Sequence, residues 1–308
     1  MQNLKDTIAK IASLKEGDID SLTELDSMGL FPAPDETTVE AFKKRLNKLF
    51  EHLNEIKSEL DKKGTLKLFD WLVLDKERQI PSEIMEEATL INEKHYGFKI
   101  DWVPGFFLSR NLGFLWGGCA ISLPEDHLSI FLIRANFAEK KRWLIYRRDE
   151  LLSHELCHIA RLPVGDRSFE ELFAYRLSPS GFRRYMGNCF QYSIDAVLFI
   201  IPFFLLLAAQ ASQQFLNLTW LPIYPFWILV SIYPLFLMIR NQLIRNTFFK
   251  AKRNLEKSGI KNAPAILFRS TKQEIGEIAA QKTDLQKYLK DKSETELRWK
   301  IICRRFMG

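Results

Sequence analysis

Two histidines and one glutamate, His154, Glu155 and His158, occur at a spacing that suits metal chemistry. Residues four apart on a helix lie one turn apart on the same face, so both imidazoles can reach one zinc ion at about 2.0–2.1 Å. Glu155 projects beside that ion, where its carboxylate can take a proton from zinc-bound water and pass it to a leaving amine. The pattern predicts a hydrolytic Zn²⁺ site, with both histidines as ligands and Glu155 as the general base.

The motif and its surroundings resemble the zincin metallopeptidases, in which a strand runs beside the substrate cleft and an H-E-x-x-H helix lies beneath it. The resemblance covers roughly residues 96–178. One branch of these enzymes has a third histidine soon after the motif, but residues 159–163 contain none.

The gluzincin branch takes its third ligand from a glutamate on the next helix, often within E-x-x-A. Residues 171–174, Glu-Leu-Phe-Ala, fit that pattern, so the resemblance implies Glu171 as the third ligand. Glu170 and Asp166 are the alternatives. Glu171 also stands three residues after Ser168, where a capping box places a glutamate for structural reasons alone.

Three further residues near the motif give less specific signals. Tyr175 follows the E-x-x-A pattern and could steady the oxyanion of a tetrahedral intermediate, although a packed tyrosine is the favoured interpretation. His127 opens a predicted strand, and a ligand role for it is a minor alternative. Cys157 is expected to be a core thiol that faces away from its histidine neighbours.

The elements around the motif alternate between strand and helix patterns. A helix that carries the motif is expected from about Arg147, and a second helix from Ser168. Strands are predicted at 98–102, 115–123 and 127–137, the last as the edge strand beside the cleft. These elements predict an α+β fold with a zincin-like metallopeptidase domain.

Additional helices are expected on both sides of this domain. A capping box at Thr37 and an apolar stripe predict a long helix that ends near Gly64, and Pro81 opens another helix. Ser270 and Ser293 each begin a Ser-x-x-Gln or Ser-x-x-Glu pattern, which predicts two C-terminal helices.

One stretch of 44 residues, from Ala196 to Ile239, contains no Asp, Glu, Lys, Arg or His. A helix needs about 20 apolar residues to cross a bilayer, so the stretch predicts two transmembrane helices, at about 194–211 and 220–239. The residues between them, 212–217, are polar enough for a turn. A hydrophobic hairpin buried in a soluble protein is the alternative.

Lysine and arginine crowd both flanks of this stretch, while the turn carries neither. The positive-inside rule therefore predicts a multi-pass membrane protein whose two termini and zinc site are cytoplasmic. The chain then divides into an N-terminal helical region 1–80, a catalytic domain 81–190, a transmembrane hairpin 191–240 and a basic helical region 241–308.

Charge and cysteine content exclude other classes. The net charge of +6 comes with no RNA-recognition signature and no paired zinc-finger cysteines, so no nucleic-acid partner is expected. The four cysteines form no disulfide framework and no C-x-x-C pair, which favours free thiols in a reducing compartment. The first residues contain no apolar segment, so no cleavable signal peptide is expected.

The combination resembles membrane peptidases of the gluzincin kind, in which a cytosolic zinc domain is tied to transmembrane helices. In the best-known arrangement a transmembrane hairpin separates the two ligand helices, whereas here it follows both, so the site is expected on the membrane surface. The favoured interpretation is a zinc metallopeptidase that cleaves peptide or protein substrates at the cytoplasmic face of a lipid bilayer. The alternative is a membrane metal-binding scaffold or sensor without peptidase activity.

Overall fold

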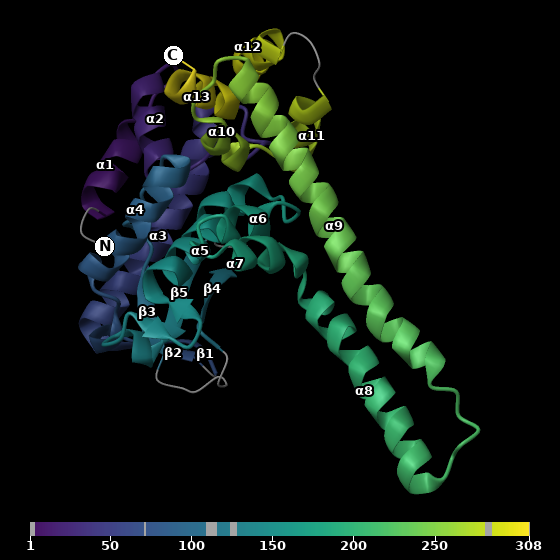
Figure 1. Cartoon of the computed structure of the whole chain (residues 1–308). Coiled ribbons are helices and arrows are strands. Elements are labelled where there is room, and N and C mark those ends of the chain that lie inside the picture. Colours follow the sequence, from purple (N-terminus) through teal and green to yellow (C-terminus); the bar gives the residue numbers. More distant parts are fainter. Residues whose placement is uncertain (1–3, 71, 109–115, 124–127, 281–284, 308) are drawn as a thin grey trace.

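The computed structural model describes residues 4–70, 72–108, 116–123, 128–280 and 285–307. The chain is a mixed α+β protein that is mostly helical, with small sheets and two long apolar helices. Figure 1 shows a helix-rich body from which α8 and α9 project as a hairpin. The predicted α+β class is confirmed at this level.

The N-terminal third supplies helices and one small strand pair: α1 Leu4–Ser13, α2 Ile19–Ser27, α3 Val39–Lys63, β1 Thr65–Phe69, β2 Leu72–Asp75 and α4 Ser82–Tyr96. The predicted end of the long helix is confirmed, because Gly64 caps α3 with a left-handed φ of 73°. The predicted cap is wrong by one residue. Thr38, not Thr37, accepts a hydrogen bond at this N-terminus, from the backbone N–H of Ala41 over 3.2 Å.

A three-stranded sheet lies next to the motif helix and consists of β3 Gly105–Leu108, β4 Gly118–Leu123 and β5 Leu128–Arg134. The strand order is β3-β5-β4, with β3 parallel and β4 antiparallel to β5. A short strand pair follows, β6 Arg142–Trp143 and β7 Tyr146–Arg147.

The strand predicted at 98–102 is not formed, although these residues alternate between buried and exposed as predicted. The backbone N–H of Ile100 donates to Thr89 Oγ1 over 2.7 Å, and that of Lys99 donates to the Ser27 carbonyl over 2.8 Å. The Thr89 hydroxyl and the Ser27 carbonyl therefore accept the backbone hydrogen bonds that a neighbouring strand would accept in a sheet.

The segment 127–137 corresponds to β5, which is the central strand and not the predicted edge. The reason is topological, because β3 pairs with β5 on the side opposite β4. The edge strand beside the motif helix is β4, within the strand predicted at 115–123. His127 lies outside the described residues.

The motif helix and its two successors are α5 Arg148–Arg161, α6 Glu170–Tyr175 and α7 Gly181–Met186. The predicted start near Arg147 is confirmed for α5. The cap predicted at Ser168 is wrong, because α6 begins behind Phe169 and has no side-chain cap. The N–H of Ser168 donates instead to Asp166 Oδ1 over 2.9 Å. Glu171 therefore does not serve as a capping-box glutamate.

The projecting hairpin consists of α8 Ser193–Leu216 and α9 Tyr224–Lys257, both long and apolar enough to cross a membrane. Only 17% and 11% of their most apolar windows are buried within the protein. This exposure suits lipid-facing helices and disfavours a hairpin buried in a soluble core. The connecting loop is 217–223, later than the predicted turn, and α9 continues beyond the predicted span through basic residues to Lys257.

The C-terminal helices are α10 Ala263–Arg269, α11 Lys272–Ala280, α12 Leu285–Thr295 and α13 Leu297–Phe306. A capping box does open α11, but Thr271 and Glu274 form it, one residue later than the one predicted from Ser270. Ser293 lies inside α12, so the capping box predicted there is wrong.

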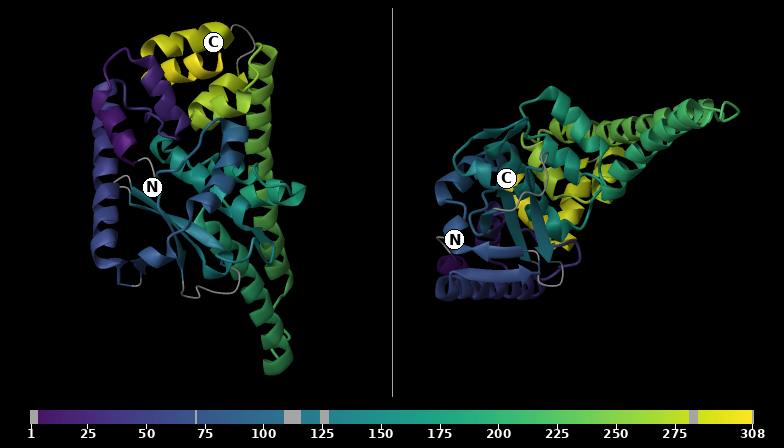
Figure 2. Two further views of the ribbon diagram at one scale, coloured as in Figure 1. Left: turned by 90° about the vertical axis from the view of Figure 1, so that its left-hand side faces the viewer. Right: turned by 90° about the horizontal axis from the view of Figure 1, so that it is seen from below.

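One buried core joins the two ends of the chain, since its members run from Leu4 to Ile302. Asp26 of α2 is buried and forms ion pairs with Arg269 of α10, at 2.9 Å, and with Arg305 of α13. Figure 2 shows α1 and α2 beside the C-terminal helices. The regional boundaries at 80, 190 and 240 stay predictions.

Candidate metal centre

Packing against α4 fixes the motif helix. Asn92 of α4 is fully buried, and its Nδ2 donates to the Ser153 carbonyl over 3.0 Å and to Cys157 Sγ over 3.3 Å. Cys157 is therefore a core thiol on the inner face of α5, as predicted. An adjoining face of α5 carries His154 and His158.

The helix α6 is held against α5 by buried polar groups. Arg161 of α5 is fully buried, with its guanidinium 4.6 Å from the ring centroid of Phe173 and 3.5 Å from Asp166 Oδ2. The hydroxyl of Tyr96 donates to the Phe173 carbonyl over 2.7 Å. Asp166, one of the alternative ligands, therefore forms an ion pair with Arg161 and accepts a hydrogen bond from the backbone N–H of Ser168.

Three predicted site residues come together between α5 and α6. The Nε2 atoms of His154 and His158 are 3.2 Å apart. Glu171 places Oε2 at 3.6 Å from the first and Oε1 at 3.5 Å from the second. Ligand atoms of a tetrahedral zinc site with bonds of about 2.0–2.1 Å are about 3.3–3.4 Å apart. With one atom taken from each residue, the donors lie within 4.8 Å of one another, and this set of two imidazoles and one carboxylate suits a zinc ion.

Glu170 faces the other side of the same imidazole. Its Oε2 lies 3.6 Å from Nδ1 of His158, whereas Glu171 faces Nε2. Metal-binding histidines commonly direct their second ring nitrogen at a carboxylate, which fixes the ring's orientation. The geometry gives the two neighbouring glutamates different positions, with Glu171 in the cluster and Glu170 behind it.

The electrostatics of the cluster favour a cation. Burial lowers the pKa of His154 well below its usual value, and the charges of His158 and Arg183 lower it further. The pKa of His158 rises to about 9, because the hydrogen bond to Glu170 and the charges of nearby carboxylates outweigh its burial. Burial raises the pKa of Glu171 to about 7. The negative potential that raises the pKa of His158 would also attract a metal ion.

Glu155 points toward the sheet. Its Oε2 accepts a hydrogen bond of 3.0 Å from the backbone N–H of Ala120 on β4. Burial raises the pKa of this carboxyl. Glu155 therefore lies between the cluster and the edge strand, next to His154 but outside the three-residue donor group.

Tyr175 packs against the cluster. Its ring lies edge-to-face on His154, with centroids 4.6 Å apart and an interplanar angle of 73°. A Cβ at Gly187 would come within 2.3 Å of this ring, so glycine is needed there. The predicted packing role of Tyr175 is confirmed, while an oxyanion role for its hydroxyl stays a prediction.

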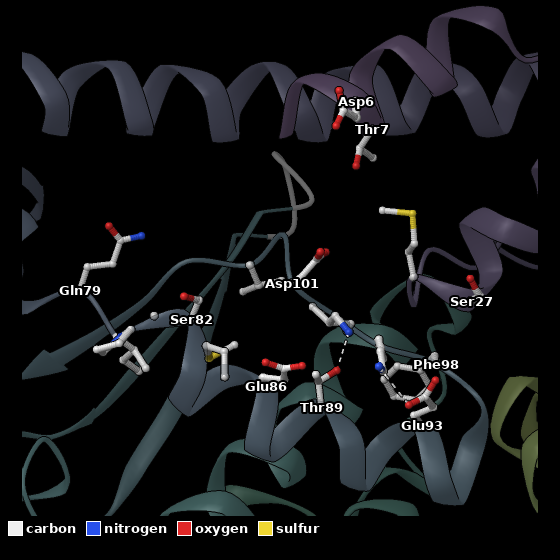
Figure 3. A pocket seen from close by; sticks show the side chains of 18 of the residues that line it. Asp6, Thr7, Ser27, Gln79, Ser82, Glu86, Thr89, Glu93, Phe98 and Asp101 are labelled. Carbon is white, nitrogen blue, oxygen red and sulfur yellow. Dashed lines mark hydrogen bonds and ion pairs between the residues drawn. The ribbon is translucent and has the colours of Figure 1, made fainter. Parts of the chain in front are cut away.

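A cavity of about 960 Å³ lies elsewhere in the body. Figure 3 shows Glu86, Thr89 and Glu93 of α4 on one side of it and Asp6 and Thr7 of α1 on the other. None of the predicted site residues lines this cavity.

The positioning residues were not foreseen from the sequence. Asn92, Arg161 and Gly187 act through tertiary contacts, and no local pattern identifies them. The sequence indicates Glu170 only as a competing ligand, and its place beside Glu171 is the available signal. In comparisons with protein-family models, curated proteins and solved structures, none matches this chain.

Proposed function

We propose that this chain is a membrane-anchored zinc metallopeptidase of the zincin kind that hydrolyses peptide bonds at the cytoplasmic face of a membrane. The observation that carries the proposal is the cluster of His154, His158 and Glu171, in which one donor atom from each residue lies within 4.8 Å of the others. Glu155 stands beside it and accepts a hydrogen bond from Ala120 on β4, an outer strand of the sheet.

The residues around the cluster have distinct roles in this proposal. When bound, zinc polarises a peptide carbonyl and lowers the pKa of water toward ~7. Glu155 accepts the proton of the attacking water and transfers it to the leaving amine. Glu170 orients the imidazole of His158, and the hydrogen bond from Ala120 orients Glu155.

The edge of β4 provides a place for an extended substrate. Gly117 accepts a backbone hydrogen bond from Arg134 of β5, so the alternating polar groups of Gly118 and Ala120 face away from β5. A peptide can add to such an edge through main-chain hydrogen bonds. A peptide bound in this way would pass Glu155, whose carboxylate accepts a hydrogen bond from Ala120.

A metal-binding scaffold or sensor is the second candidate function. A structural zinc site normally has four protein ligands, whereas the donor group found among the described residues has two histidines and one glutamate. Three protein ligands and an adjacent carboxylate are typical of catalytic sites, and this comparison favours the peptidase.

Metal removal tests the function directly. We expect chelation of the purified, detergent-solubilised protein to abolish peptide hydrolysis, and stoichiometric zinc to restore it. His158→Ala should lose zinc, measured by elemental analysis, because one of three protein ligands is gone. His95→Ala is the matched control on an exposed face of α4. Hydrolysis that survives chelation at full rate would contradict the proposal.

The membrane anchor rests on the hairpin and on the charges at its base. Asp195 and Arg240 form an ion pair of 2.5 Å where the apolar segments meet the body, and Tyr233 donates to Asp195 over 2.9 Å. Charged groups near the ends of spans are paired in this way because lipid does not solvate them. We propose two spans with both termini in the cytoplasm.

Fractionation tests this anchor. We expect the protein to stay in the membrane pellet after high-salt and carbonate washing, because screening charges does not remove two apolar spans from lipid. Reporters at either terminus should be cytoplasmic, and a reporter inserted in loop 217–223 should be on the other side. Recovery of the protein in the soluble fraction would contradict the two spans.

A further inference from the structure

Three large apolar side chains are exposed on two neighbouring elements, the β6–β7 turn and α7. Leu144 and Ile145 occupy the turn between β6 and β7 and are 51% and 70% exposed, and Phe182 of α7 is 73% exposed. Arg183 joins the two elements, because its guanidinium donates to the Ile145 carbonyl over 3.2 Å. We call Leu144, Ile145 and Phe182 the turn patch.

The turn holds its apolar residues at a conformational cost. Leu144 has a φ of 51°, in the left-handed region, where non-glycine residues are uncommon. A two-residue hairpin turn with positive φ at its first central position normally has glycine there. Among the described non-glycine residues, Asn217 is the other one with positive φ, and asparagine tolerates it. Folding alone does not explain a leucine at this position.

The patch belongs to elements that pack beside the proposed membrane boundary. Asn241 of α9 donates to the Tyr185 carbonyl over 2.8 Å, and Arg245 donates to the Arg184 carbonyl over 3.1 Å. These contacts place α7 beside the turns of α9 that follow Ile239, the last residue of the apolar stretch. With a rise of about 1.5 Å per residue, α7 lies within about 10 Å of that boundary along the helix axis.

We propose that the turn patch inserts into the interfacial region of the bilayer and forms a second membrane contact, continuous with the base of the hairpin. Exposed apolar side chains beside cationic residues are typical of such interfacial contacts, and Lys140 and Arg142 are exposed on the approach to the turn. This inference rests on the proposed membrane anchor, and it does not depend on peptidase activity.

A second contact would fix the orientation of the body. Two helices that leave the bilayer side by side permit the body to tilt, whereas an additional contact through β6, β7 and α7 would restrict that tilt. Arg183 also pairs with Glu150 of α5 over 3.0 Å, so the patch is linked to the helix that carries His154. The metal centre is thereby held close to the lipid surface, and the accessible substrates are polypeptide segments near the headgroups.

Site-specific fluorescence tests the proposal on the full chain in nanodiscs of mixed phosphatidylcholine and phosphatidylglycerol. A Cys119→Ser/Cys303→Ser background removes the two partly exposed thiols and keeps the two buried ones. A fluorophore is then attached to Ile145→Cys, to Phe182→Cys or to Leu205→Cys, an exposed position inside α8. The matched control is Lys290→Cys at an exposed position of α12, a helix that lies by the C-terminal end of α9 and away from the projecting apolar part of the hairpin (Figure 1).

We expect lipids that carry a spin label near the headgroup to quench the probes at 145 and 182 several-fold more than the probe at 290. Adding Leu144→Gly/Ile145→Ser, which suits the turn better, should reduce quenching at 182. Quenching at 205 with none at 145 or 182 would overturn the docking and leave the anchor intact. No quenching at 205 would overturn the anchor and the docking together. Burial of the probes only in nanodiscs that hold two copies would assign the patch to a dimer contact and overturn the lipid contact.

Discussion

Glu155→Gln should retain zinc and lose peptide hydrolysis by roughly 10²–10⁴-fold, the range of general acid–base catalysis. The substitution preserves the size of the side chain, and a glutamine oxygen can still accept the hydrogen bond from Ala120. It removes the carboxylate that takes the proton. Because Glu155 lies outside the three-residue donor group, metal content should not change.

The measurement combines elemental zinc, thermal stability and hydrolysis rate on the same samples, since a variant without zinc says nothing about the base. Glu86→Gln, at an exposed position on α4, controls for the loss of one carboxylate. If Glu155→Gln cleaves peptides as fast as the unmodified chain, Glu155 is not the base. If the zinc-replete unmodified chain cleaves nothing, the scaffold function is favoured.

Glu171→Gln and Glu170→Gln should differ strongly in zinc affinity, although the residues are adjacent. Glu170 faces only Nδ1 of His158, so its loss should weaken binding by the roughly 10–100-fold typical of an outer partner. Glu171 faces both Nε2 atoms, so its loss should weaken binding by more than that. Competition with a chromophoric chelator measures both constants.

The pair of variants is its own control, because each removes one negative charge from the same turn of α6. Equal losses of zinc affinity in the two variants would show that affinity depends on the charge of these residues and not on their position. A larger loss in Glu170→Gln would assign the ligand one residue earlier and contradict the present placement. Loss of fold in either variant is detected separately by far-ultraviolet circular dichroism.

The sequence predicts the elements and residues that depend on local pattern. The long helix up to Gly64, the motif helix α5 and the two apolar helices follow from periodicity, a left-handed glycine cap and hydropathy. The proximity of His154 and His158 follows from their spacing on one helix. These features need no knowledge of distant parts of the chain.

Other features depend on long-range contacts, and pattern reasoning failed there. Residues 98–102 alternate like a strand, yet Thr89 and a loop carbonyl satisfy their backbone. The position of β5 at the centre of the sheet depends on its parallel pairing with β3. The distinct positions of Glu170 and Glu171 depend on how Arg161 and Tyr96 hold α6. The resemblance favours Glu171 as the ligand, but the separate position of Glu170 behind His158 follows only from that packing.

The ion pairs of Asp26 have a consequence for biosynthesis. This buried carboxylate meets Arg269 and Arg305, which lie 243 and 279 residues later in the chain. Breaking a buried pair costs about 3–5 kcal/mol, so α2 lacks its stable environment until α10 and α13 have left the ribosome. The α8–α9 hairpin emerges before them and would enter the bilayer first. If the hairpin spans a membrane as proposed, the body would therefore complete its folding while already tethered, because its N-terminal helices pack stably only after the last segment of the chain is made.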